Sequence, residues 1–219
     1  MDRGRTPGHD RVLDAMPVTR IVVPFAGANG KSRLQTSPAA RHELALAMLG
    51  DVLEACVEVG PTLVVTGDAD AAAVAEAAGA RTVGDPGGGQ GAAVQAALAG
   101  LGPGPLLVVN ADLPCLEPGD LLALVEATPT GGLALAEAPD GTTNALSLSA
   151  PTAFAPLYGT GSAARFHARA AELGIESISA EIENLVDDVD TIDDLARLAS
   201  RCGPRTRASL ADRPVEALQ

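Results

Sequence analysis

Carboxylates stand at two places in the sequence where they could hold a divalent cation. Asp112 follows the apolar run of residues 105–109 and would lie at the carboxyl end of a buried strand. Asp188 and Asp190 belong to the run LVDDVDTIDDL, and alternate residues of an extended chain point the same way, so these two share one face. Carboxylate oxygens are the ligands that magnesium prefers in proteins. The pattern favours a magnesium site; a turn cap at Asp112 and a solvated acidic turn at 187–190 are the alternatives.

The segment FAGANGKSRL at 25–34 has the composition of a phosphate-binding loop. Its two glycines would let backbone N–H groups approach a ligand closely, and Lys31 and Arg33 supply positive charge. Lys31 is the single lysine among 15 basic residues, and a compact ammonium on a flexible stem is not replaceable by arginine where it must meet a phosphate. The spacing is not that of a Walker loop. The alternative is an ordinary turn.

A second glycine-rich segment, GDPGGGQGAAV, runs into a helical pattern. Gly87, Gly88, Gly89 and Gly91 would let the backbone pass beneath a planar base or a phosphate, and a helix N-terminus favours anions. This segment is interpreted as part of a nucleotide site, with a flexible connector as the alternative.

A third segment, FAPLYGTGSAARFH, also leads into a helix. Gly159, Gly161 and Ser162 precede that helix and could form a nest of backbone N–H groups for a carboxylate or phosphate. His167 lies one turn into the helix and could line the nest, although a lone histidine is more often structural.

Strands and helices alternate along the chain, which indicates an α/β fold with a mostly parallel sheet and flanking helices. In such sheets ligands bind beyond the carboxyl ends of the strands, so loops 25–33, 84–91 and 110–115 should meet at one edge. Strands are expected at 19–25, 61–67, 80–85, 105–112, 131–138, 144–150 and 175–182. Helices are expected at 40–60, 68–79, 90–102, 118–128, 161–174 and 191–203, the last capped by Thr191.

The length of 219 residues predicts one domain, at 18–202. The flanking segments 1–17 and 203–219 are polar, aperiodic and rich in proline and arginine, so both are predicted to be disordered tails.

Composition excludes several classes of function. A net charge of -13 disfavours nucleic acid and anionic membranes as partners. No apolar run reaches the roughly 18 residues that a membrane span needs, and the N-terminus lacks an apolar signal core. Three widely spaced cysteines match neither a metal motif nor a disulfide framework, so Cys56 and Cys115 are expected in the core. The chain is expected to be cytoplasmic.

The ordered set of segments resembles the 2-phospho-L-lactate or phosphoenolpyruvate guanylyltransferases of coenzyme F-420 biosynthesis. The resemblance covers residues 20–201 and rests on VPFAGANGKSRL, DPGGGQGAAVQAAL, NADLPCLEPGDL, DGTTNAL, YGTGSAARFHARAAELG and DVDTIDDL. It implies a single-domain nucleotidyltransferase fold related to the GT-A and Rossmann-like folds. It also implies GTP as donor, Mg²⁺ as cofactor, a phosphorylated three-carbon acid as acceptor, and a homodimer.

The resemblance also implies roles for individual residues. Lys31, Arg33 and Asp112 are expected to be catalytic, and Asp112, Asp188 and Asp190 to hold the metal. The acceptor is expected at Thr143, Asn144, Gly159 and Ser162. The nucleotide is expected at Pro24, Phe25, Gly27, Lys31, Gly88 and Gly89. Two features depart from the family pattern: Ala26 and Gly27 stand where many members have another lysine, and Asn144 stands where some have a second threonine.

The expected acceptor is phosphoenolpyruvate or, as a second choice, 2-phospho-L-lactate; 3-phosphoglycerate differs from them by a few atoms and is an alternative. A nucleotidyltransferase with a sugar phosphate or molybdopterin acceptor is a rival interpretation. A nucleotide-binding module without activity is another, but it would not need three carboxylates at 112, 188 and 190.

Overall fold

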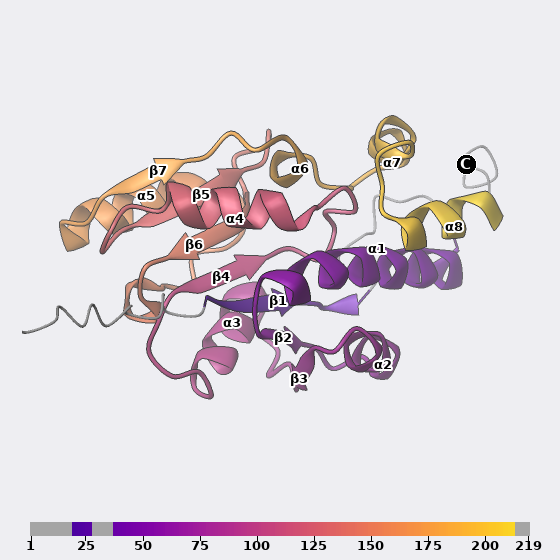
Figure 1. Ribbon diagram of the computed structural model, residues 1–219, viewed down its shortest axis with the longest axis horizontal. Helices are drawn as coiled ribbons and strands as arrows, with labels where there is room; N and C mark the ends of the chain where they lie inside the picture. The colour runs from indigo at the N-terminus through magenta and orange to yellow at the C-terminus, as the bar shows by residue number, and fades with distance from the viewer. Residues whose placement is uncertain (1–18, 28–36, 213–219) are drawn as a thin grey trace, which may run out of the picture.

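The computed structural model describes residues 19–27 and 37–212, so the predicted phosphate contacts Lys31 and Arg33 lie outside the described residues (Figure 1). One seven-stranded sheet has the order β3-β2-β1-β4-β6-β5-β7. All neighbouring strands are parallel except that β6 is antiparallel to both β4 and β5, which confirms a mostly parallel sheet. The strands are β1 Arg20–Pro24, β2 Thr62–Val65, β3 Arg81–Val83, β4 Leu106–Val109, β5 Leu133–Glu137, β6 Thr143–Leu148 and β7 Ser177–Ser179.

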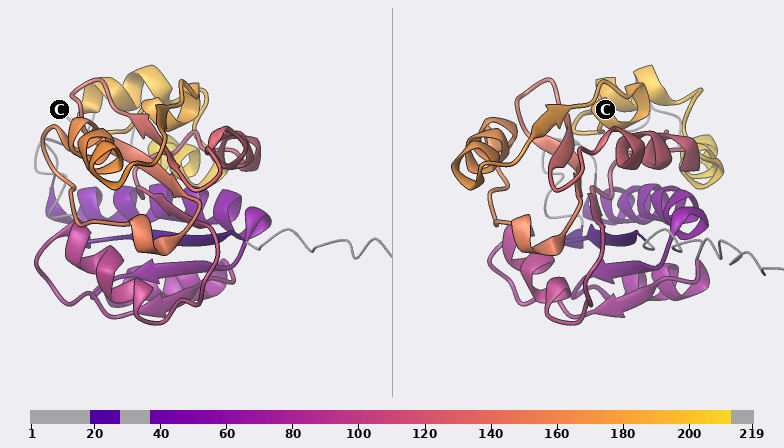
Figure 2. Two further views of the ribbon diagram at one scale, coloured as in Figure 1. Left: turned by 90° about the vertical axis from the view of Figure 1, so that its left-hand side faces the viewer. Right: turned by 60° about the vertical axis from the view of Figure 1, so that its left-hand side comes forward.

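Helices cover both faces of the sheet, so the domain has three layers (Figures 1 and 2). Successive residues of a strand face opposite sides. In β1, Ile21 and Val23 therefore enter a core with α1 and α4, whereas Val22 enters a second core with α3 and α5. The helices are α1 Pro38–Val59, α2 Ala69–Ala77, α3 Gln90–Leu98, α4 Pro118–Ala127, α5 Ser162–Leu173, α6 Glu183–Val186, α7 Ile192–Leu198 and α8 Pro204–Asp212. No helix in the described ranges is both long and apolar enough to cross a membrane.

The antiparallel direction of β6 matters for function, because β6 begins at the edge of the sheet where the parallel strand β4 ends. Val109 at the end of β4 pairs with Ala145 near the start of β6. Directly beyond this pair, the N–H of Asn110 donates to the carbonyl of Asn144 at 2.9 Å. The first residues of β6 thus lie beside the last residues of β4, so a threonine that begins a strand reaches the ligand-binding edge.

A third, smaller core joins the end of the chain to α1. It contains Leu44 and Met48 of α1, Val189, Leu198 of α7 and Leu210 of α8, together with Cys115, Leu195 and Cys202. Cys56 and Cys115 are both buried, as predicted. This core fixes the segment before α7, which carries two of the predicted metal ligands, against the rest of the domain.

The prediction that residues 203–219 form a disordered tail is wrong for residues 204–212. They form α8, which lies along α1 (Figure 1). The buried carboxylate of Asp51 in α1 accepts hydrogen bonds from the N–H groups of Arg205 and Thr206, at 2.9 and 2.8 Å. Asp51 therefore caps the helix N-terminus from 154 residues away in sequence, a pairing that local pattern cannot indicate.

We expect Asp51→Ala to lower the free energy of unfolding by about 2 kcal/mol, because two N–H groups lose a charged acceptor in a buried place. In a chain of this size that corresponds to a fall of roughly 4–8 °C in the melting temperature, measurable by calorimetry. Glu54→Ala is the control: Glu54 pairs with Arg205 at 3.0 Å, but both side chains are exposed, so its loss should cost less than about 1 kcal/mol. Equal effects of the two substitutions would contradict this account of α8.

Candidate active site

A pocket of about 230 Å³ opens at the carboxyl edge of the sheet. Residues from the three loops that the sequence singled out contribute to it, so their predicted meeting at one edge is confirmed. The described part of its lining comprises Pro24, Phe25, Ala26, Gly27, Ala45, Met48, Asp85, Gly89, Gln90, Ala93, Asn110, Ala111, Asp112 and Asp190. Four of the predicted nucleotide contacts, Pro24, Phe25, Gly27 and Gly89, are among them. The fifth described one, Gly88, lies in an adjacent groove with Gly89 and Tyr158.

A second pocket, of about 350 Å³, adjoins the first. It is lined by Gln90, Asn110, Asp140, Thr142, Thr143, Tyr158, Gly159, Ser162, Asp188 and Asp190. Gln90, Asn110 and Asp190 border both pockets, so two ligands bound there would meet at these residues. Most of the second lining is polar, which suits a small charged ligand.

Three carboxylates lie at the junction of the two pockets. One oxygen from each of Asp112, Asp188 and Asp190 lies within 4.8 Å of the other two, and all three side chains are half-buried. Like charges at this separation repel, and oxygen donors in this number are what a divalent cation requires. These residues can therefore hold a metal ion, and Asp112 meets Asp188 although the two stand far apart in the sequence.

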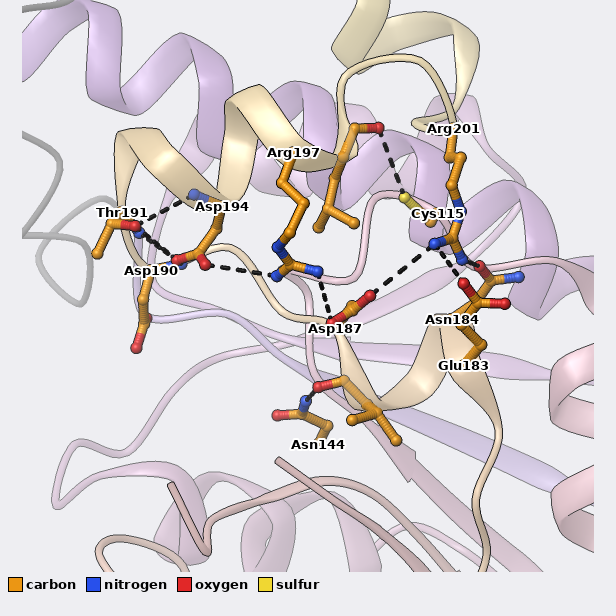
Figure 3. A network of polar contacts seen from close by, with 12 residues as sticks. Cys115, Asn144, Glu183, Asn184, Asp187, Asp190, Thr191, Asp194, Arg197 and Arg201 are labelled. Atoms are coloured by element: carbon orange, nitrogen blue, oxygen red, sulfur yellow. Dashed lines mark hydrogen bonds and ion pairs between the residues drawn. The ribbon is translucent and has the colours of Figure 1, made fainter. Parts of the chain in front are cut away.

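The backbone fixes the acidic segment 187–190 against the end of β4. The N–H of Val189 donates to the carbonyl of Asp112 at 3.1 Å, and the Val189 side chain is buried in the third core. Since successive residues of an extended chain point in opposite directions, burial of Val189 turns Asp188 and Asp190 toward the site. Thr191 caps α7 in a capping box with Asp194, as predicted, which ends the extended segment (Figure 3).

The other acids of this segment are structural. Asp187 forms an ion pair with Arg197 at 2.8 Å and lies 3.9 Å from Arg201, on the side away from Asp190 (Figure 3). Asp194 is held by the Thr191 hydroxyl at 2.7 Å. Burial raises the pKa of Asp194, but hydrogen bonds from Thr191, Asp190 and Arg197 outweigh burial and hold that pKa below its usual value. The pairing of Asp187 with Arg197 explains why Asp188 and Asp190, but not Asp187, face the pockets.

A chain of side-chain amides connects the two pockets to the acidic segment. Gln90 donates to Asn110 at 2.6 Å, and Asn110 lies 3.3 Å from the Asn144 side-chain oxygen, to which it donates. Asn144 in turn donates to the carbonyl of Val186 at 3.0 Å (Figure 3). Asn144 is buried behind the second pocket rather than lining it. Asn144 therefore positions the acidic segment through its contact with Val186. Gln90 and Asn110 line both pockets, and sequence reasoning missed them.

Thr143, Gly159 and Ser162, which are predicted to bind the acceptor substrate, all line the second pocket. The buried Ser162 hydroxyl donates to the Thr143 hydroxyl oxygen at 2.9 Å, which leaves the Thr143 proton for another acceptor. The predicted nest of backbone N–H groups is not open to a ligand at Ser162 and Ala163. The N–H groups of Ser162 and Ala163 donate to the carbonyls of Gly159 and Gly141, so they hold the loop itself rather than an anion.

Two neighbouring residues shape this loop. The Arg165 guanidinium donates to the carbonyls of Leu157, Tyr158 and Thr160 and braces the turn. His167 does not line the second pocket: its ring nitrogens contact the hydroxyls of Ser177 and Ser179 at 2.8 and 2.9 Å, which joins α5 to β7. The structural alternative for His167 is therefore the one observed.

Comparison with known proteins places this geometry in a family. The family model described as "Guanylyl transferase CofC like" matches residues 19–206. The phosphoenolpyruvate guanylyltransferase of Conexibacter woesei is 38% identical over 202 residues, covering 86% of this chain and 89% of that protein. The protein of the same name from Streptomyces scabiei is 38% identical over 208 residues, covering 87% of this chain and 95% of that protein.

Solved structures agree on the fold. A nucleotidyl transferase from Methanothermobacter thermautotroptrophicus superposes with a TM-score of 0.61 at 17% identity, covering 90% of this chain and 99% of that one. The fold is thus the nucleotidyltransferase type that the resemblance implied. With the family model spanning nearly all of the described residues and relatives matched over most of their length, the chain belongs to the family of CofC-like guanylyl transferases.

Proposed function

We propose that this chain transfers GMP from GTP to the phosphate of phosphoenolpyruvate and releases pyrophosphate, as a step toward coenzyme F-420. The observation that carries the proposal is the placement of Asp112, Asp188 and Asp190 where the two pockets join. One pocket would hold the nucleotide and the other the acid. The names of the relatives favour phosphoenolpyruvate over 2-phospho-L-lactate and 3-phosphoglycerate.

In the proposed reaction, an oxygen of the acceptor phosphate attacks the α-phosphorus of GTP. The bond between the α-phosphorus and the oxygen that bridges to the β-phosphorus breaks, and pyrophosphate leaves with that oxygen. A phosphate monoester is already ionised near neutral pH, so no side chain has to remove a proton. The difficulty is bringing two anions together, and positioning plus charge stabilisation supply most of the catalysis in such transfers.

Residues at the junction of the two pockets would together overcome the repulsion between the two anionic substrates. Asp112, Asp188 and Asp190 would hold Mg²⁺, which when bound supplies the positive charge that lets two phosphates approach. Gln90 and Asn110 border both pockets, so they would contact both ligands and keep their reacting groups side by side. Thr143, oriented by Ser162, would donate a hydrogen bond to the acid.

Lys31 and Arg33 are proposed to bind the leaving pyrophosphate. They follow Gly27, the last described residue before their segment, and Gly27 lines the first pocket. Lys31→Ala should lower kcat/KM for GTP by roughly 10²-fold, the loss typical for one donor that meets developing charge, and Lys31→Arg should restore it only partly.

Steady-state kinetics with GTP varied would check this prediction. Arg81→Ala is the control, because Arg81 is an exposed cation in β3 outside both pockets. Full activity of Lys31→Arg would mean that any cation suffices at position 31, as on an ordinary surface.

The function itself is tested by pyrophosphate release from a panel of GTP, ATP, CTP and UTP with each of the three acids. We expect release with GTP and phosphoenolpyruvate that depends on both. A sugar phosphate or molybdopterin that replaces phosphoenolpyruvate as the best acceptor would favour the rival nucleotidyltransferase. Nucleotide binding without pyrophosphate release under any combination would favour a binding module. A cytoplasmic location and a homodimer are further parts of the proposal.

A further inference from the structure

Asp85 is a carboxylate of the first pocket to which neither the family resemblance nor the metal site gives a role. It follows β3, and its N–H donates to the carbonyl of Thr66 at 3.2 Å, which fixes the backbone at the sheet edge. Its Oδ1 accepts the N–H of Gly87 at 2.8 Å, which fixes the side chain. Within the described ranges, its Oδ2 accepts no hydrogen bond. The carboxylate is half-buried and lines the pocket.

Asp85 and Asp112 lie at opposite ends of this pocket. Asp112 follows β4 and Asp85 follows β3, and the order β3-β2-β1-β4 places three strand spacings between them. Three spacings amount to about 14 Å. Between these ends, Pro24 at the end of β1 and Phe25 directly after it contribute to the wall. If the proposed function holds, the α-phosphate of the nucleotide lies at Asp112, and its base extends toward Asp85.

Guanine presents two neighbouring hydrogen-bond donors on one edge, the N1–H and the 2-amino group. A carboxylate carries about four acceptor sites on two oxygens, so Asp85 can accept both donors and still accept the Gly87 N–H. Adenine presents a lone pair at N1 on the same edge, which a carboxylate repels. We propose that Asp85 recognises the N1–H and 2-amino edge of guanine and thereby makes the site selective for guanine nucleotides. The proposal rests on the proposed function for the orientation of the nucleotide.

The test is a measurement of nucleotide binding by calorimetry with Mg²⁺, for GTP, ITP, XTP and ATP. Wild-type protein should bind GTP best, ITP more weakly because inosine lacks the 2-amino group, and ATP weakest. In Asp85→Asn, the side-chain carbonyl can still accept the N1–H while the amide donates to the 2-oxo group of xanthine. Each hydrogen bond with a charged partner contributes a factor of roughly ten or more to the binding affinity. The ratio of GTP to XTP affinity should therefore fall by at least about a hundredfold, with XTP binding gained.

Asp70→Asn is the matched control, since Asp70 is an exposed carboxylate of the adjacent α2 and lies outside the pocket. In Asp85→Asn the side-chain oxygen of the introduced amide can still accept the Gly87 N–H, so the loop should keep its structure. An unchanged ratio of GTP to XTP affinity in Asp85→Asn would overturn the inference. Binding is measured without acceptor, so a wild-type protein that prefers GTP but releases no pyrophosphate would defeat the proposed function and leave the role of Asp85 standing.

Discussion

Asp112→Asn is expected to lower kcat/KM for guanylyl transfer by about 10³-fold or more, equivalent to roughly 4 kcal/mol of transition-state stabilisation. The substitution keeps the shape of the side chain and removes one of three negative charges that meet at the junction of the pockets. It thereby weakens the hold on the cation that brings two phosphates together. Asp190→Asn should act alike, because Asp190 borders both pockets.

Two measurements separate this effect from a loss of structure. Calorimetric titration with Mn²⁺ should show weaker metal binding in Asp112→Asn and Asp190→Asn, while the melting temperature stays within a few degrees of the wild type. Asp187→Asn is the control from the same acidic run. Asp187 pairs with Arg197 on the other side of the segment, so this variant should lose stability and keep its metal affinity. Wild-type metal affinity in both site variants would remove these residues from the metal site.

Gly159→Val is expected to raise the KM for the acceptor by about a hundredfold or more and to leave the KM for GTP nearly unchanged. Gly159 lines the second pocket with φ at 106°, a conformation that a β-branched residue adopts only under strain. The new side chain would also occupy space that the acid needs. Ser162→Ala should act in the same direction by roughly tenfold, because Thr143 loses the hydrogen bond that orients its hydroxyl.

Kinetics with each substrate varied in turn would check this series. Ser149→Ala is the control, because the Ser149 hydroxyl also makes a 2.7 Å hydrogen bond, to the Pro129 carbonyl, yet lies outside both pockets. If Ser162→Ala or Gly159→Val raised the KM for GTP and left the KM for the acceptor unchanged, the two pockets would have been assigned the wrong way round.

The core of the fold was predictable because it depends on local pattern. Short apolar runs that alternate with helical periods gave the parallel strands, and the position of Asp112 after one of them placed it at the sheet edge. The alternation in DVD predicted that Asp188 and Asp190 share a face, and the buried Val189 between them is what enforces it.

The parts that sequence reasoning missed depend on long-range contacts. Helix α8 is capped by Asp51 from α1, and nothing near residue 204 signals that partner. The antiparallel direction of β6 follows from pairing with β4 rather than from its own residues. Asp85 and Asn110 were within reach of the rule that identified Asp112, since Asp85 ends the strand predicted at 80–85 and Asn110 directly follows the apolar run 105–109. Gln90 gave no comparable signal, because its role depends on the contact with Asn110.

The central claim is that this chain joins GMP to a phosphorylated acid, and its most direct test is the product itself. The reaction of the purified protein with Mg²⁺, GTP and phosphoenolpyruvate would be followed by phosphorus NMR. The account predicts that pyrophosphate and a new diphosphate diester, in which the phosphate of GMP is joined to the phosphate of the acid, appear in equal amounts. The rate should fall to background in Asp112→Asn. Release of inorganic phosphate without the diester, or formation of the diester at an undiminished rate in Asp112→Asn, would contradict it.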